Sequence, residues 1–166
     1  MKTKNKLAEL QSLFEITHGN KFDMNKMTPC DLIDDAIVFI GRSGKEGGIV
    51  EFVKKHEDVV PFESGLITVA LGGSALSSFV QARPFYTAQN IDVLRPKQQM
   101  SLEVKMYYCL CIEANRFRYS TFGREANRTL KHLLVPDLNC VPSWVDGIVA
   151  KTVKGLVLDL ESAINV

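Results

Sequence analysis

The chain has 166 residues, 46% of them hydrophobic and 23% charged, as expected for one globular domain with a substantial core. Its 20 basic and 19 acidic residues give a net charge of +1, so a nucleic-acid-binding surface would require an uneven distribution of charge. No run approaches the roughly 18 apolar residues of a membrane span, and the first residues lack the apolar core of a signal peptide, so we expect a cytoplasmic protein.

The cysteines and histidines do not form a metal-binding pattern. The four cysteines, Cys30, Cys109, Cys111 and Cys140, contain no CxxC pair, and the three histidines are scattered. We therefore expect reduced, mostly buried thiols, with neither a metal site nor a cofactor.

The first half of the chain reads mainly as strands. Residues 6–16, KLAELQSLFEI, place leucines at helical spacing and predict a short helix or the entry to a strand. The apolar runs 35–41, 47–53 and 64–71 predict strands, and residues 72–96 mix short strands with Gly and Pro.

Helices are expected later in the chain. Ser101 is a good N-cap for a helix over SLEVKMYYCLCIEANRF, whose apolar face carries Leu102, Met106, Cys109 and Leu110. We expect this helix to be largely buried, because Tyr107, Tyr108 and Ile112 widen its apolar surface. A second short helix is predicted over 124–134, ended by Pro136, and residues 148–164 are ambiguous between strand and helix.

Strands followed by helices predict an α+β fold, a single domain with a twisted, mostly antiparallel or mixed β-sheet and a few helices. The predicted core residues are Ile37, Phe39, Ile49, Phe52, Ile67, Val69, Leu71, Met106, Leu110 and Leu134.

The loop from Gly41 to Gly48 has three interpretations: a phosphate-binding loop of a nucleotide enzyme, a plain hairpin turn, or a loop that contacts a polyanion such as DNA. A P-loop requires four residues between its glycines and then Lys-Ser/Thr, whereas GRSGKE has two residues there and a carboxylate after the lysine. Neither a clustered-carboxylate nuclease site nor a nucleophile set can be assembled from the sequence. These absences favour a protein that is not an enzyme.

Basic residues are concentrated in residues 115–134, NRFRYSTFGREANRTLKHLL, where Glu125 is the only acidic one. On the predicted helix Arg124, Arg128 and Lys131 would share one face, as suits a nucleic-acid backbone. The alternative is a solvated amphipathic helix whose neighbouring aromatics belong to the core.

Two weaker candidates lie outside that segment. Gln89 and Asn90 could read adenine through an amide, although such amides more often satisfy backbone groups. Trp144, the only tryptophan, could pack against the domain edge or serve as a docking anchor for a partner.

Several ordered blocks of the sequence resemble a known family. These blocks are FEITHGNKFDMNKM, FIGRSGKEGGIVEFV, GLITVALGGSALSSFVQARPFYTAQNIDVLRP and NRFRYSTFGREANRTLKHLLVPD. Over roughly Leu13 to Trp144 the chain resembles the target-recognition domain of type I restriction-modification DNA specificity subunits.

The resemblance implies a DNA-reading module without catalytic activity. It would dock on a methyltransferase (modification) subunit, which holds the methyl donor and modifies adenine, while a separate restriction or motor subunit cuts DNA. It also implies that the basic segment contacts phosphates, whereas the loop after Gly41 is assigned to base edges. The predicted DNA-binding residues are Arg42, Ser43 and Lys45; Gln89 and Asn90; and Arg116, Arg118, Tyr119, Arg124, Asn127, Arg128 and Lys131.

The chain departs from the family pattern in holding one such domain where the family's subunits usually carry two joined by long helices. Residues 1–145 are expected to form the recognition domain and residues 146–166 a tail or helix for a partner or dimer contact. A half-subunit that forms a homodimer, one domain of a longer protein and a stand-alone relative all stay open. The alternative from another class is an interaction protein or decoy that docks on a methyltransferase without reading DNA.

Overall fold

The computed structural model describes residues 6–32, 35–119 and 126–155. Among these residues no helix has both the length and the apolar character needed to cross a membrane. The four cysteines are free thiols, but the expectation that they are mostly buried is wrong, since only Cys109 is buried and the other three are partly exposed.

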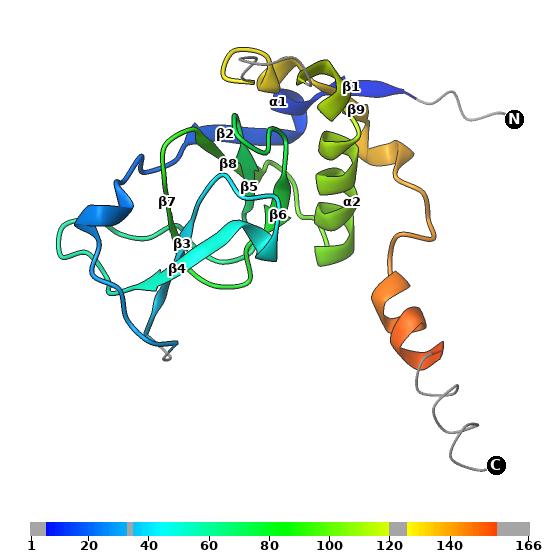
Figure 1. Cartoon of the computed structure of the whole chain (residues 1–166). Helices are drawn as coiled ribbons and strands as arrows, with labels where there is room; N and C mark the ends of the chain where they lie inside the picture. The colour runs from blue at the N-terminus through cyan, green and yellow to red at the C-terminus, as the bar shows by residue number, and fades with distance from the viewer. Residues whose placement is uncertain (1–5, 33–34, 120–125, 156–166) are drawn as a thin grey trace, which may run out of the picture.

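A four-stranded antiparallel sheet forms the centre of the domain (Figure 1). Its strand order is β2 (Phe14–His18), β8 (Ile91–Pro96), β5 (Ile67–Ala70) and β6 (Ser78–Val80). In the register of the first pair, Phe14 lies opposite Pro96 and His18 lies opposite Asp92. The sheet therefore places His18 beside the first residues of β8.

A second sheet of three strands has the order β4 (Ile49–Val53), β3 (Ile37–Ile40) and β7 (Phe85–Thr87). β3 pairs antiparallel with β4 and parallel with β7. A two-stranded sheet joins β1 (Leu7–Glu9) to β9 (Leu134–Pro136), and α1 (Leu10–Leu13) connects β1 to β2. The predicted α+β class with mixed sheets is confirmed, although the strands form three sheets rather than one.

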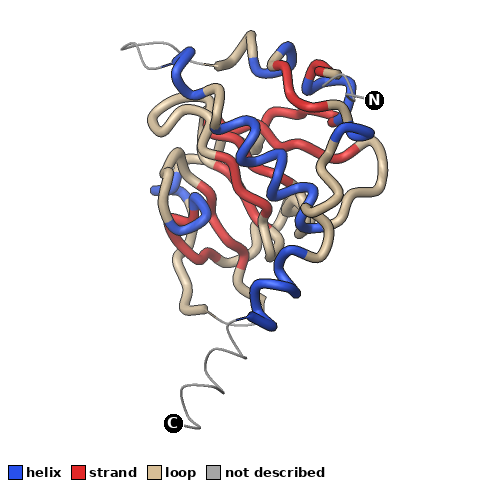
Figure 2. Tube along the Cα trace, turned by 90° about the vertical axis from the view of Figure 1, so that its right-hand side faces the viewer, coloured by secondary structure: helices blue, strands red, loops and turns tan. Residues whose placement is uncertain are grey.

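Apolar contacts hold these elements in layers. α2 (Leu102–Glu113) covers one face of the four-stranded sheet, where Phe14, Leu94 and Ile112 belong to one buried cluster (Figure 2). The other face of that sheet packs on the second sheet through Val93, together with Val38, Ile40, Leu66 and Phe85. Both faces of the central sheet are thus covered, and its functional side chains must lie at its ends or edges.

α2 begins where predicted, because the Ser101 hydroxyl accepts a hydrogen bond from the Val104 amide at 3.2 Å. Of the predicted buried face only Cys109 is buried, whereas two of the three residues predicted to widen it, Tyr108 and Ile112, are in the core. The helix buries Val104, Tyr108, Cys109 and Ile112, whereas Leu102, Met106 and Leu110 are exposed. Apolar residues recur at i and i+4 on both sides of this helix, so periodicity could not identify the side that faces the sheet.

The predicted helix over 124–134 is also wrong in its described part. Residues 126–129 form turns, η4 (Leu130–His132) is a single 3-10 turn, and β9 follows at Leu134. Leu134 is exposed because β9 alternates, placing Val135 in the core instead. Of the other predicted core residues Ile37, Phe39, Ile67, Val69 and Leu71 are buried and Ile49 and Phe52 are partly buried.

Four further 3-10 turns connect the strands and helices: η1 (Met24–Lys26), η2 (Glu46–Gly48), η3 (Arg116–Tyr119) and η5 (Leu138–Cys140). Residues 148–155 are helical and extend away from the sheets at the lower end of α2 (Figure 1). The described part of the ambiguous tail is therefore helix.

Candidate nucleic-acid interface

Five loops meet at one end of the two larger sheets. They are residues 18–21 after β2, 41–48 after β3, 71–77 after β5, 88–90 between β7 and β8, and 126–131. Backbone hydrogen bonds of 2.8–3.3 Å join them: Gly19 N to Ile91 O, Leu71 N to Asn90 O, Ala88 N to Ile40 O, Ser74 N to Arg42 O, and Ala126 N to Leu71 O. This end carries most of the predicted DNA-binding residues, and we call it the loop end.

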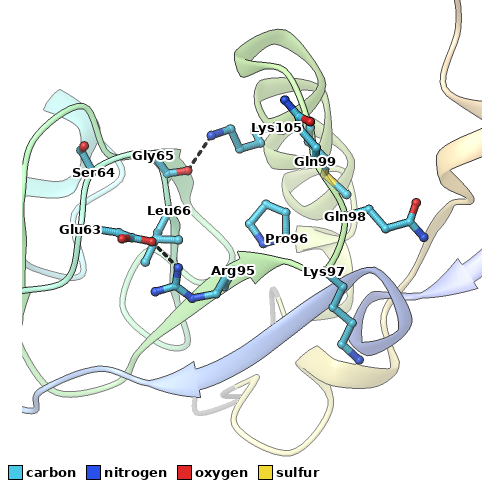
Figure 3. Close-up of a pocket in the computed structure, with 11 residues that line it drawn as sticks. Glu63, Ser64, Gly65, Leu66, Arg95, Pro96, Lys97, Gln98, Gln99 and Lys105 are labelled. Carbon is cyan, nitrogen blue, oxygen red and sulfur yellow. Dashed lines mark hydrogen bonds and ion pairs between the residues drawn. The ribbon is translucent and has the colours of Figure 1, made fainter.

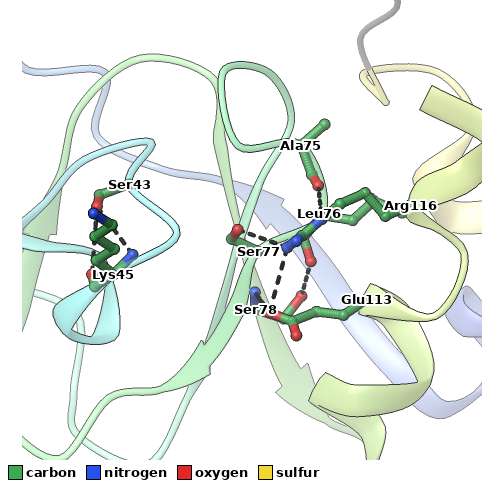
Figure 4. A network of polar contacts seen from close by, with 8 residues as sticks. All are labelled: Ser43, Lys45, Ala75, Leu76, Ser77, Ser78, Glu113 and Arg116. Carbon is green, nitrogen blue, oxygen red and sulfur yellow. Dashed lines mark hydrogen bonds and ion pairs between the residues drawn. The ribbon is translucent and has the colours of Figure 1, made fainter. Parts of the chain in front are cut away.

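The loop from Gly41 to Gly48 is a tight turn, closed by a 2.9 Å hydrogen bond from Gly41 N to Gly48 O. Gly47 and Gly48 adopt φ values of 68° and 81°, a conformation that favours glycine. Arg42 and Lys45 are exposed, whereas the Ser43 hydroxyl accepts a 3.1 Å hydrogen bond from the Lys45 amide. The two cations are thus exposed to solvent. Ser43 shapes the turn through its contacts with Lys45 (Figure 4).

Arg116 is bound to other parts of the protein, although half of its side chain is exposed. Its guanidinium donates to the Ala75 carbonyl at 3.0 Å and to the Ser77 hydroxyl at 2.8 Å, and lies 3.6 Å from a carboxylate oxygen of Glu113. Glu113 in turn accepts a 3.1 Å hydrogen bond from the Ser78 amide. Figure 4 shows this network on the side of residues 75–78 away from Ser43 and Lys45. Arg116 therefore fixes the 71–77 loop to the end of α2.

Two neighbouring hollows bring together residues that lie far apart in the sequence. The first, of about 250 Å³, is lined by His18, Lys21, Leu71, Asn90, Ile91 and Asn127. The second, of about 450 Å³, is lined by Ile16, His18, Asp92, Asn127, Arg128, Leu130, Lys131 and His132. Four predicted residues, Asn90, Asn127, Arg128 and Lys131, thus line one continuous region with His18.

Sequence reasoning missed three of these lining residues, His18, Lys21 and His132. The signal for the first two was their position, since His18 ends a strand and Lys21 lies in the loop that follows it. His132 pairs with Glu9 at 3.1 Å, and together with Gln11 it holds the pKa of that carboxyl below its ordinary value.

His18 and Asp92 form the most buried charged contact at the loop end. His18 Nδ1 lies 2.6 Å from Asp92 Oδ1, and the Asp92 side chain is 4% exposed while that of His18 is 63% exposed. Burial raises the pKa of Asp92, and the hydrogen bond from His18 opposes that shift. The pair therefore places an exposed imidazole on a buried carboxylate.

The remaining predicted residues that the structure describes do not line these hollows. Arg118 lies 5.7 Å from the ring centre of Phe117, and the Tyr119 hydroxyl lies 2.5 Å from that of Thr129. Gln89 is exposed beside Asn90, whose φ of 59° turns the chain into β8. Arg124 lies outside the described residues.

A polar hollow at the opposite end of the central sheet is a poorer candidate. Its cations are already engaged: Arg95 pairs with Glu63, Lys105 Nζ donates to Gly65 O at 2.8 Å, and Lys97 Nζ donates to Gln11 O at 2.7 Å (Figure 3). Across the described ranges, no cluster of three or more His, Cys, Asp or Glu side chains is placed to hold a metal ion.

Trp144 lies at the domain edge, where its ring meets Tyr107 edge-on at 6.4 Å and remains 57% exposed. The structure thus contains both the packing contact and the exposed surface that the two interpretations require.

The fold is similar to solved specificity subunits. The S subunit of a type I restriction-modification system from M. genitalium matches with a TM-score of 0.60 and 18% identity, over 99% of this chain and 43% of that one. The HsdS subunit from Thermoanaerobacter tengcongensis matches with a TM-score of 0.59 and 15% identity, over 95% of this chain and 39% of that one.

A third structure, from a study of complex assembly and conformational transition of the type I R-M system, matches with a TM-score of 0.61 and 15% identity, over 95% of this chain and 40% of that one. The chain spans about two fifths of the length of the solved chains that it matches. Comparison with curated proteins found no match.

The family model for the type I restriction modification DNA specificity domain matches residues 3–136, which include every strand and every loop of the loop end. Such a domain recognises DNA and is not a catalytic one, so neither an enzyme nor a decoy without DNA recognition is favoured. The chain belongs to the family of type I restriction modification DNA specificity domains.

Proposed function

We propose that the chain is a sequence-specific DNA-binding specificity subunit, or half-subunit, of a type I-like restriction-modification system. It directs a partner adenine methyltransferase, and through it a restriction or motor subunit, to the target in double-stranded DNA. The observation that carries this proposal is the match of the DNA specificity domain over residues 3–136.

The loop end supports DNA as the ligand. Arg42, Lys45, Arg128 and Lys131 are exposed there, and Asn90 and Asn127 line the first hollow together with His18. Guanidinium and ammonium groups bind phosphates, and amides can read base edges. Asp92, the acid that lines the second hollow, is paired with His18.

The contacts divide the predicted residues by role. We assign Arg128 and Lys131 to contacts with DNA phosphates. Arg42 and Lys45 are assigned to base edges in the adjacent groove of the DNA. Arg116 and Ser43 support the surface, since their polar groups bind other parts of the protein.

Residues 1–145 form the recognition domain in this proposal, and residues 146–166 provide a partner or dimer contact. Ile148, Val149 and Val153 are exposed on the helix at 148–155, as expected for a helix that packs on another chain. Two copies related by a two-fold axis would recognise a palindromic split target. The cytoplasm remains the expected location.

The experiment is DNA binding by the full chain together with its methyltransferase subunit, measured over a range of salt concentrations. Replacing Arg128 and Lys131 with alanine should weaken binding to all sequences and lower the salt slope by about 0.9 for each lost phosphate contact. The matched control is the alanine pair at Lys54 and Lys55, two exposed lysines after β4. Equal binding by both double variants would contradict the assigned surface.

DNA binding by the intact chain distinguishes a specificity subunit from the alternative, an interaction protein that does not read DNA. If the chain joins the methyltransferase but leaves the affinity and sequence preference for DNA unchanged, it acts as an interaction protein. A gain in sequence preference supports a specificity subunit.

A further inference from the structure

His18 stands at the junction of the two hollows of the loop end, lining both of them. The alternation of β2 explains its position, because Phe14, Ile16 and His18 point to the same face of the strand. Phe14 is fully buried in the core, Ile16 is partly buried, and the His18 side chain is 63% exposed. The row thus leads from the core to the surface that DNA would occupy.

The carboxylate of Asp92 determines which nitrogen of His18 carries a proton. Asp92 lies opposite His18 in the sheet register and approaches Nδ1 to 2.6 Å. A carboxylate accepts hydrogen bonds, so Nδ1 donates and Nε2 is the nitrogen directed to a ligand. The neutral ring would present an acceptor at Nε2, whereas the imidazolium would present a donor.

The charged groups that face His18 are of both signs. Asp92 faces it from β8 and attracts a positive charge on the ring, whereas Lys21 from the loop after β2 and Arg128 and Lys131 from the 126–131 loop repel one. His132 lines the same hollow, but its Nδ1 is paired with Glu9. A phosphate that enters this ring of cations would offset their repulsion and leave Asp92 to stabilise the proton.

We propose that His18, oriented by Asp92, donates a hydrogen bond from Nε2 to a DNA phosphate as an imidazolium, so that the chain takes up a proton when it binds DNA. This histidine is not among the DNA-binding residues predicted from the sequence. The inference rests on the proposed function and adds a protonation-linked contact to it.

The test is the pH dependence of binding to a labelled duplex of mixed sequence, by the full chain with its methyltransferase subunit, between about pH 6 and about pH 8.5. Wild-type affinity should fall about tenfold as the pH rises, which is the size expected for one charge-assisted hydrogen bond. His18→Gln should remove most of this dependence. At low pH it should also lower the salt slope by about 0.9, and at high pH it should leave the slope unchanged.

Two histidine variants serve as controls. His56→Gln removes a ring that stacks on Phe22 at 5.5 Å, outside the loop end, and should leave the profile unchanged. His132→Gln removes the other histidine of the second hollow. If the pH dependence follows His132, or persists in His18→Gln, the inference is wrong.

A spectroscopic measurement distinguishes this role from a structural one. Both ring nitrogens of His18 should give the resonances of protonated nitrogens in the DNA complex, and Asp92→Asn should reduce that signal. If Asp92→Asn does not fold, the wild-type resonances and the His18→Gln profile still decide the question.

The possible outcomes also separate this inference from the proposed function. Loss of binding in the Arg128 and Lys131 variants with no effect of His18→Gln would leave the function intact and overturn the inference. An effect of His18→Gln confined to one DNA sequence would assign Nε2 to a base edge and overturn the phosphate contact. If the wild-type complex does not bind duplex DNA, both proposals are wrong.

Discussion

Arg116 donates a 2.8 Å hydrogen bond from its guanidinium to the hydroxyl of Ser77, and so joins the turn after α2 to the loop after β5. A second donor of the same guanidinium binds the Ala75 carbonyl. Both acceptors belong to a loop of the candidate interface, and both are nearly buried. An arginine predicted to bind DNA therefore supports a loop of the candidate interface from within the protein.

Arg116→Ala should lower the free energy of unfolding by about 1–3 kcal/mol, because two hydrogen bonds to a charged donor are lost. Urea denaturation of the full chain measures this change. Lys131→Ala removes an exposed cation of the same surface and should change the stability by less than about 0.5 kcal/mol. Equal stability of the two variants would contradict the supporting role of Arg116.

Gly19→Ala should destabilise the loop after β2. A Cβ at Gly19 would lie 1.9 Å from the hydroxyl oxygen of Thr87 and 3.0 Å from the Ile91 carbonyl oxygen. Thr87 cannot move freely, because its hydroxyl accepts a 2.8 Å hydrogen bond from the Asn20 amide and its own amide donates to Asn20 Oδ1 at 3.1 Å.

We expect Gly19→Ala to cost about 1–3 kcal/mol of unfolding free energy, as overpacking typically does. Thermal unfolding monitored by circular dichroism is the measurement. Gly155→Ala is the control, since nothing lies within 4 Å of the added Cβ and the residue lies in the helix at 148–155. If Gly19→Ala melts at the same temperature as the wild type, the 18–21 loop can rearrange to accommodate the added Cβ.

The strands could be predicted because their residues form short apolar runs bounded by Gly, Pro and polar residues. The runs around Phe39 and Val69 are buried on both faces of their sheets, so length and punctuation identified them without an alternating pattern. Apolar composition could not identify the buried face of α2, because Leu110 and Ile112 are equally apolar. Only the position of the sheet decides which of the two is buried.

Ile112→Ala should therefore lower the free energy of unfolding by about 2–5 kcal/mol, because a fully buried side chain is truncated. Leu110→Ala, two residues earlier and 66% exposed, should change it by less than about 0.5 kcal/mol. Chemical denaturation of the two variants compares the two sides of one helix. Similar losses would mean that the Leu110 side is covered in solution.

The candidate site could be predicted only where its residues are adjacent in sequence. Arg42 and Lys45 share one loop, and Arg128 and Lys131 share another, so composition identified both pairs. His18 could not be found this way, because its role depends on Asp92, which is 74 residues away. Pairing across a sheet register, rather than local spacing, brings such residues together.

Stability should depend on pH in opposite ways at two aspartates. Burial raises the pKa of Asp92, so the folded chain holds this proton more tightly than the unfolded chain does. Its contribution to stability is therefore present at low pH and is lost as the pH rises through the raised pKa. The hydrogen bond from the Asn139 amide lowers the pKa of Asp137, whose contribution is present above the ordinary carboxyl range and is lost as the pH falls.

Asp92→Asn removes an ionisation that the folded state disfavours. Its stability relative to the wild type should increase as the pH rises from about 4 towards 7. Asp137→Asn removes an ionisation that the folded state favours, so its relative stability should decrease as the pH rises from about 2 to about 5. Urea denaturation of each variant across its own range measures the two slopes. If Asp92→Asn instead loses relative stability as the pH rises, the pairing with His18 outweighs the cost of burying the carboxylate.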